Sequence, residues 1–157
     1  MIEVFYEIAY RINRKFCVIP LLYGSTGLQL LINENLMPDD IDVLIPRFLL
    51  LQNGWGELLS FMQNQGYELI DLHEHTFRKG RTKIAFAEID DLEEFANIKL
   101  TDSTIKETDG AFYFLLTLSQ YLNVYVSSLN DGYRRQKNNG KDLQKIEVIK
   151  SALNPIK

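Results

Sequence analysis

The sequence contains little cysteine and proline, and it has no long hydrophobic run. Cys17 is the only cysteine in 157 residues, which excludes an intrachain disulfide and favours a reducing compartment. Its apolar neighbours predict a buried thiol. No apolar segment approaches the roughly 20 residues that span a bilayer, and the first residues follow a helical rather than a signal-peptide pattern. We therefore expect a cytoplasmic protein with no membrane partner.

The composition supports a folded domain with an uneven distribution of charge. Hydrophobic residues make up 46% of the chain and aromatic residues 11%, enough for a substantial core. The net charge of −4 argues against a broad nucleic-acid surface. Residues 88–109 hold eight acids and two lysines, whereas residues 134–150 hold six Lys or Arg against two acids. The basic segment indicates either a local anion site or a solvated helix face.

The hydrophobic periodicity predicts an α/β fold followed by helices. We expect helices over 2–15, 25–33, 48–65, 91–98, 112–129 and 141–153, and strands over 18–23 and 40–45. Residues 67–77 and 81–89 each alternate, and Lys79-Gly80 is a turn signal between them, so they predict a hairpin. Residues 99–110 are polar and irregular. This order predicts an α/β core over residues 1–110 and a helical segment packed on it over residues 111–157.

Two acids interrupt an apolar stretch at Asp40 and Asp42. In a strand, side chains at i and i+2 point to one face, about 7 Å apart, while Ile41 and Val43 turn to the other. Two such carboxylates repel each other unless a cation lies between them. Mg²⁺ accepts one or two carboxylates together with waters and phosphate oxygens. The pair therefore predicts a metal site; the alternative is ordinary turn chemistry at the tip of a strand.

A second feature, Gly24-Ser25, ends the preceding apolar strand. A strand that runs through glycine into a helix leaves unpaired backbone N–H groups, which favour an anion. Gly24 lets a phosphate approach the backbone, and Ser25 offers a hydroxyl. A phosphate cradle next to a metal site predicts the binding of a nucleoside triphosphate.

These two stretches together resemble the nucleotidyltransferase superfamily, the polymerase-beta-like fold of small adenylyltransferases. Its signature is an apolar strand, Gly followed by Gly or Ser, a short helix and an Asp-apolar-Asp/Glu-apolar strand, and "LLYGS" and "DIDVLI" fit it. The resemblance covers about residues 18–46. Fourteen residues separate Ser25 from Asp40, at or beyond the long end of the usual spacing. The resemblance implies a small mixed sheet flanked by helices, an NTP substrate, and Mg²⁺ or Mn²⁺ on Asp40 and Asp42.

The resemblance also implies a third carboxylate on a later strand. Glu88 is the preferred candidate, Asp90 is the competitor, and a chain with neither is the third option. The expected hairpin places Asp71, His73 and His75 on one strand face. The two histidines have zinc-ligand spacing, but exposed strand histidines are the simpler interpretation.

The basic segment near the C-terminus offers a phosphate contact. In several families of this fold a C-terminal helix closes over the nucleotide, and Lys141-Asp142 resembles a Lys-Asp pair near its start. Lys141 would hold the triphosphate and Asp142 would cap the helix or position Lys141. Arg134, Arg135 and Lys137 would help to neutralise phosphate. The alternative is that these charges are simply solvated.

The sequence thus predicts a metal-dependent nucleotidyltransferase. An acceptor hydroxyl would attack the α-phosphorus of an NTP bound at Gly24, Ser25 and Lys141, with Asp40, Asp42 and Glu88 as catalytic carboxylates. The acceptor, whether small molecule, protein or tRNA, is not readable from the residues, and a homodimer is compatible with them. The alternative function is a non-catalytic nucleotide-binding or toxin–antitoxin-type interaction module of the same fold.

Overall fold

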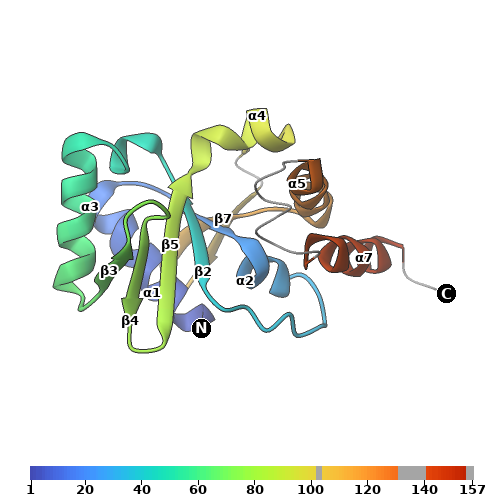
Figure 1. The fold of residues 1–157 in the computed structure, drawn as a ribbon, viewed down its shortest axis with the longest axis horizontal. Helices are drawn as coiled ribbons and strands as arrows, with labels where there is room; N and C mark the ends of the chain where they lie inside the picture. The colour runs from blue at the N-terminus through green and yellow to red at the C-terminus, as the bar shows by residue number, and fades with distance from the viewer. Residues whose placement is uncertain (102–103, 131–140, 155–157) are drawn as a thin grey trace.

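The chain is built around a mixed sheet with the strand order β3-β4-β5-β2-β1-β7-β6 (Figure 1). This is a computed structural model that describes residues 1–101, 104–130 and 141–154. Helices flank the sheet, which confirms the predicted α/β class. The strands are β1 (Leu21–Tyr23), β2 (Ile41–Ile45), β3 (Glu68–Asp71), β4 (Thr76–Lys79), β5 (Thr82–Glu88), β6 (Ile105–Thr108) and β7 (Ala111–Leu115).

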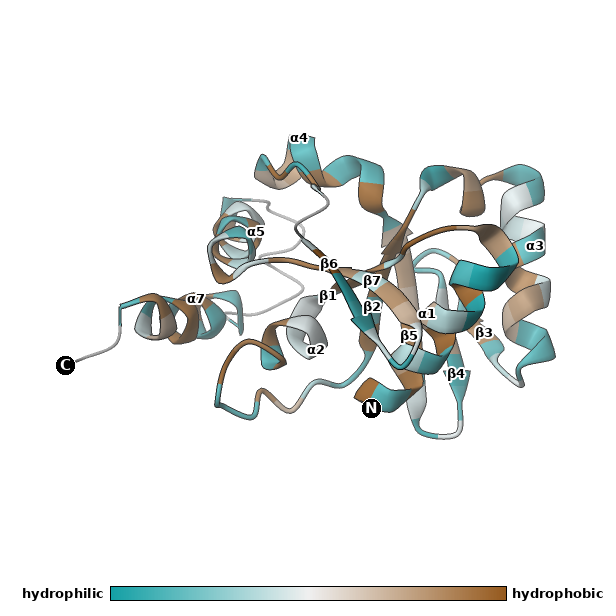
Figure 2. Cartoon of the chain, turned by 180° about the vertical axis from the view of Figure 1, so that it is seen from behind, coloured by the Kyte–Doolittle hydropathy of each residue, from teal (hydrophilic) through white to brown (hydrophobic). Residues whose placement is uncertain are grey.

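The helices follow from amphipathic periods. In α1, buried residues recur at Phe5, Ile8, Ala9 and Ile12, and Figure 2 shows both hydrophilic and hydrophobic residues on this helix. The helices are α1 (Ile2–Phe16), α2 (Gly24–Gln29), α3 (Gln52–Asn64), α4 (Leu92–Ala96), α5 (Leu118–Asn130) and α7 (Lys141–Leu153), with 3₁₀ turns η1 (Arg47–Leu49) and η2 (Ile89–Asp91). Within the described ranges, no helix is both long and apolar enough to cross a membrane.

The sheet has one face filled with apolar side chains. Ile41 and Val43 of β2 lie in parallel register with Ile84 and Phe86 of β5, and all four are buried. Aromatic contacts tie this face to its helices: Phe77 packs edge-on against Phe86 and Trp55 of α3 packs on Phe77, while Phe5 of α1 packs edge-on against Tyr113 of β7. The residues that alternate with these, including Asp42, point to the opposite face.

The helix predicted over 112–129 is wrong in its first part. Residues 111–115 form β7, which pairs in parallel with β1, and the helix begins at Leu118. Burial in β7 alternates with period two, and its aromatic residues suit a strand. The polar segment expected to be irregular contains β6, joined to β7 through Asp109-Gly110, a common hairpin turn pair. The proposed division of the chain at residue 110 stays a prediction.

Two further expectations need correction. The alternating segment 67–77 is not one strand, because β3 ends at Asp71 and a turn over 72–75 leads into β4. The predicted hairpin therefore pairs only β4 with β5, and a second hairpin pairs β3 with β4. Cys17 is exposed rather than buried, because it ends α1 in the left-handed conformation, which turns the residue out of the apolar stripe.

Candidate active site

A cavity of about 860 Å³ lies over the sheet face opposite the aromatic core. Its floor comes from β2, β5 and β4, and its walls come from the β1–α2 turn, the loop before β2, α5 and α7. Among the described residues, it is lined by five of the six residues predicted to be catalytic, metal-binding or nucleotide-binding: Gly24, Ser25, Asp40, Asp42 and Lys141. The fold therefore gathers residues that are up to 117 positions apart in the sequence.

Gly24 and Asp42 are in direct contact. Gly24 has φ +65°, a conformation that glycine adopts without strain. A Cβ on this residue would overlap the Oδ2 atom of Asp42. Tyr23, which precedes the turn, is paired in register with Asp42 on the antiparallel strands β1 and β2. The glycine turn and the second acid thus occupy one place, as the sequence predicted.

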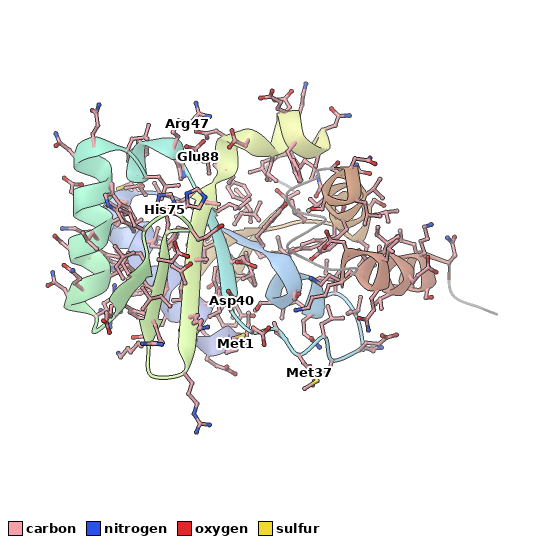
Figure 3. All side chains as sticks on the ribbon, viewed as in Figure 1. Met1, Met37, Asp40, Arg47, His75 and Glu88 are labelled. Atoms are coloured by element: carbon pink, nitrogen blue, oxygen red, sulfur yellow. The ribbon has the colours of Figure 1, made fainter. Side chains whose placement is uncertain are left out.

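Asp40 lies immediately before β2, which begins at Ile41, and is fixed through its backbone. Its carbonyl oxygen accepts a hydrogen bond from the Thr26 hydroxyl at 3.1 Å, which ties the strand start to α2. Asp40 and Asp42 are both half-buried and both line the cavity, whereas their common strand face stays a prediction because β2 begins at Ile41. Figure 3 shows Asp40 at the end of β2 that faces α2.

The neighbour of Asp42 on β5 is an alanine. One row of residues in register crosses the cavity face of the sheet from β1 to β3, in the order Tyr23, Asp42, Ala85, Thr76 and Asp71. Three strand spacings place Asp71 about 14 Å from Asp42 between Cα atoms, too far for both to hold one ion. The cavity-facing positions of β5 carry Lys83, Ala85 and Ala87 and no acid.

Glu88 does not join Asp40 and Asp42. It shares the parity of Ile84 and Phe86, as expected, but that parity belongs to the opposite, apolar face of the sheet. Its carboxylate pairs with the Arg47 guanidinium at 2.9 Å, at the far end of β2 from Asp40 (Figure 3). Asp90 is engaged there too, since its carboxylate accepts the Arg47 backbone N–H.

Arg47 and these acids form a cluster that connects the end of β2 to the end of β5. Arg47 also pairs with Asp91 at 3.2 Å. The hydrogen bond and charge of Glu88 raise the pKa of Arg47, with Asp91 and Asp90 adding to the effect. Neither Glu88 nor Asp90 lines the cavity. The choice of Glu88 or Asp90 as the neighbour of the Asp pair relied on the alternation of side chains along the strand. Alternation alone does not tell which face of the sheet the helices cover.

The histidines lie outside the predicted strand face. His73 and His75 belong to the turn between β3 and β4, and His75 packs edge-on against Trp55 with the ring centroids 5.0 Å apart. Among the described residues, no group of three or more His, Cys, Asp or Glu side chains is placed to hold a metal ion. The zinc interpretation thus gains no support. Asp71 does line the cavity, together with Glu74 of the same turn.

The long spacing between Ser25 and Asp40 is accommodated by a folded loop. The Gln29 side-chain amide donates to the Glu34 carbonyl oxygen at 2.5 Å and accepts the Leu36 N–H at 2.7 Å. The Asn35 side chain accepts the Met37 N–H at 2.9 Å. Residues 34–39 thereby form one wall of the cavity. The extra residues enlarge the site and leave the contact between Gly24 and Asp42 intact.

Helix α7 brings a positive rim to the cavity. Lys141 is exposed at its first turn, Asp142 is 2% exposed, and Lys145 lies with its Nζ 5.1 Å from the Tyr125 ring centroid. All four line the cavity. Lys145 and Tyr125 were missed from the sequence, although Lys145 lies one helical turn after Lys141. Arg134, Arg135 and Lys137 lie outside the described residues.

The donor set fits one Mg²⁺ or Mn²⁺ ion. Asp40 and Asp42 supply two carboxylates to the cavity, which the Gly24–Ser25 turn also lines, and Asp42 lies against Gly24. Two carboxylates completed by phosphate oxygens and waters are a common Mg²⁺ environment. A second ion would need a further carboxylate close by, and Ala85 stands where β5 could have supplied one.

Solved structures share this fold. The solution structure of the antibiotic-resistance factor ANT(2'')-Ia matches with a TM-score of 0.57 and 11% identity, over 97% of this chain and 84% of that one. The crystal structure of an antigenic nucleotidyltransferase-like protein from Paracoccidioides brasiliensis matches with a TM-score of 0.56 and 13% identity, over 93% of this chain and 73% of that one. The chain therefore has a nucleotidyltransferase-type fold, which confirms the resemblance seen in the sequence.

The sequence relationship is more specific. No family model matches the chain. The uncharacterized protein YnaI of Bacillus subtilis (strain 168) is 45% identical over 145 residues, which cover 92% of each chain. The protein described here belongs to the same family as YnaI.

Proposed function

We propose that this protein is a nucleotidyltransferase that moves a nucleoside monophosphate from an NTP to an acceptor hydroxyl. The observation that carries the proposal is the contact of the Asp42 carboxylate with Gly24, which puts an acid that could bind a metal ion against a glycine turn lining the same cavity. The nucleotidyltransferase-type fold supports the same kind of reaction.

The triphosphate would lie on the β1–α2 turn. The backbone N–H groups around Gly24 and the Ser25 hydroxyl are the donors, and the six-residue helix α2 adds only a small dipole. Lys141 and Lys145, which line the same cavity, would neutralise phosphate charge. A Mg²⁺ or Mn²⁺ ion held by Asp40 and Asp42 would, when bound, neutralise charge on the phosphate oxygens.

The acceptor would enter over Ala85 and Thr76, where small side chains leave space on the floor. Its hydroxyl oxygen would form a bond to the α-phosphorus as the bond from the α-phosphorus to the bridging oxygen breaks. Pyrophosphate leaves and the hydroxyl proton passes to water. Positioning and charge neutralisation account for most catalysis of this kind. Glu88 has no role in this proposal, because it lies outside the cavity.

The test is calorimetric titration of ATP, GTP, CTP and UTP with and without Mg²⁺, combined with an assay for pyrophosphate release. We expect Mg²⁺-dependent binding that Asp42→Asn weakens at least tenfold, which is about 1.4 kcal/mol. Asp109→Asn removes the same charge from the β6–β7 turn, outside the cavity, and should bind as the wild type does. Absence of Mg²⁺-dependent binding to the wild type would overturn the nucleotide site. If NTP binds but no pyrophosphate is released with a small-molecule, a protein or a tRNA acceptor, the proposed transfer reaction is wrong.

A further inference from the structure

Tyr121 of α5 reaches the strand that leads into the glycine turn. Its side chain is completely buried, and its hydroxyl donates a hydrogen bond to the Leu22 carbonyl oxygen at 2.9 Å. Leu22 is two residues before Gly24. The carbonyl that accepts this bond therefore belongs to the backbone that sets the position of the turn.

Gly27 makes room for this contact. A Cβ on Gly27 would overlap the Tyr121 hydroxyl oxygen and would lie 2.7 Å from the Leu22 carbonyl oxygen. The end of β1, the first turn of α2 and the middle of α5 thus meet at one point without free space. A small shift of the Tyr121 ring must be transmitted to the backbone on both sides of Gly24, because packed interiors have no slack.

Tyr121 is also connected to the part of the cavity rim that α7 forms. The ring of Tyr125, one helical turn further along α5, stacks on Tyr121 with a centroid distance of 6.4 Å and an interplanar angle of 18°. The Nζ of Lys145 on α7 lies 5.1 Å from the Tyr125 ring centroid. A continuous column therefore runs from the Leu22 carbonyl through two tyrosines to Lys145.

We propose that Tyr121 is a positioning residue that sets the separation between the Gly24–Ser25 turn and the lysines of α7. The inference rests on the proposed function, in which both of these elements bind the triphosphate. Tyr121 acts through other residues and touches no substrate itself.

The electrostatic environment keeps the Tyr121 hydroxyl protonated. Burial raises the pKa of Tyr121 well above its usual value, and the charges of Tyr125, Tyr23 and Asp42 raise it further. A protonated hydroxyl can donate to the Leu22 carbonyl, whereas a phenolate could only repel it. The Tyr121 hydroxyl therefore remains a hydrogen-bond donor over the physiological pH range.

Tyr121→Phe removes the hydrogen bond and keeps the ring. Tyr113→Phe is the matched control, because Tyr113 is 4% exposed and its hydroxyl is hydrogen-bonded to the Thr108 hydroxyl at 3.0 Å, on β6–β7 and outside the cavity. Gly27→Ala is the second variant, since its Cβ would displace the same hydroxyl. Each protein is titrated with Mg²⁺ and the NTP that the wild type binds most tightly, and amide hydrogen exchange is followed at residues 24–27.

We expect Tyr121→Phe and Gly27→Ala to weaken NTP binding, or raise its KM, about tenfold with kcat within about twofold of the wild type. Exchange at residues 24–27 should accelerate in both, and Tyr113→Phe should change neither quantity. Unchanged exchange at residues 24–27 in Tyr121→Phe would overturn the positioning role, whatever the nucleotide result. Faster exchange with unaltered NTP affinity would overturn its link to binding. If the wild type binds no NTP, the proposed function fails, and the exchange data still decide whether Tyr121 holds the turn.

Discussion

The Asp42 carboxylate occupies the space that a Cβ on Gly24 would need. This contact joins a turn on β1 to an acid on β2, two elements that the sequence separates by a helix and a long loop. Even the methyl group of an alanine at residue 24 would therefore overlap the Asp42 carboxylate.

Gly24→Ala is expected to impair both stability and nucleotide binding. Its φ of +65° costs an alanine about 1–2 kcal/mol, and the added methyl must also displace the Asp42 carboxylate. We expect a loss of at least that much free energy of unfolding in urea, with NTP affinity lowered about tenfold or more. Gly56→Ala is the control, because nothing lies within 4 Å of a Cβ there and a helix interior favours alanine. Equal NTP affinity in Gly24→Ala and the wild type would contradict the assigned turn.

Ala85→Asp tests whether the site lacks a third carboxylate. Residue 85 lies in register with Asp42 on the neighbouring strand, so an aspartate there would share its face. We expect Mn²⁺ binding without nucleotide, followed by calorimetry, to become about tenfold tighter because a third charged ligand is added. Ala87→Asp adds the same charge to the cavity one step further along β5 and should give a smaller gain. Identical gains in the two variants would indicate a general charge effect.

Glu88→Gln separates the structural role of Glu88 from the catalytic one predicted by the sequence. Because Glu88 pairs with Arg47 outside the cavity, we expect NTP affinity and transfer rate within about twofold of the wild type. The melting temperature should fall, since Arg47 loses an ion-pair partner. If Glu88→Gln binds NTP normally but transfers no nucleotide, Glu88 has a catalytic role after all.

Alkaline unfolding should reveal the burial of Tyr121. Its pKa is raised in the folded protein, so above about pH 10 the unfolded chain loses this proton first and the folded state binds more protons. Stability therefore falls as pH rises, by about 1.4 kcal/mol per pH unit for one such group. Guanidinium unfolding at pH 8 to 11 should show the stability advantage of the wild type over Tyr121→Phe shrinking above pH 10. A constant difference over this range would contradict the assignment.

The strongest sequence prediction concerned short-range patterns. The Asp-Ile-Asp alternation fixed which side chains of β2 would be buried, and Ile41 and Val43 are buried as expected. The strand-glycine-helix order predicted the turn at Gly24. Both patterns depend on the backbone geometry of a few neighbouring residues, which the sequence controls directly.

The errors have a common physical origin. The run at residues 112–115 is apolar enough for either a buried helix or a strand, and only pairing with β1 decides for a strand. The signal that could have found it was Asp109-Gly110. Glu88 was assigned to the site from the alternation of side chains along its strand. Alternation distinguishes two faces of the sheet, but only the packing of Phe77 and Trp55 decides which face is the core. The third carboxylate was expected from the resemblance alone.

The sequence by itself determined two local features, the glycine turn after β1 and the alternation around Asp42, because period-two alternation and glycine's freedom at positive φ are local properties of the backbone, and the pairing of β1 with β2 brings the two into contact. Only the tertiary structure decided what surrounds that pair. The strand register puts Ala85 beside Asp42, helix packing brings Tyr121 to the strand before the turn and the α7 lysines to the cavity, and the Gln29 amide folds the loop into a wall. These relationships join residues far apart in the chain, and they arise from burial and pairing that no short stretch of sequence contains.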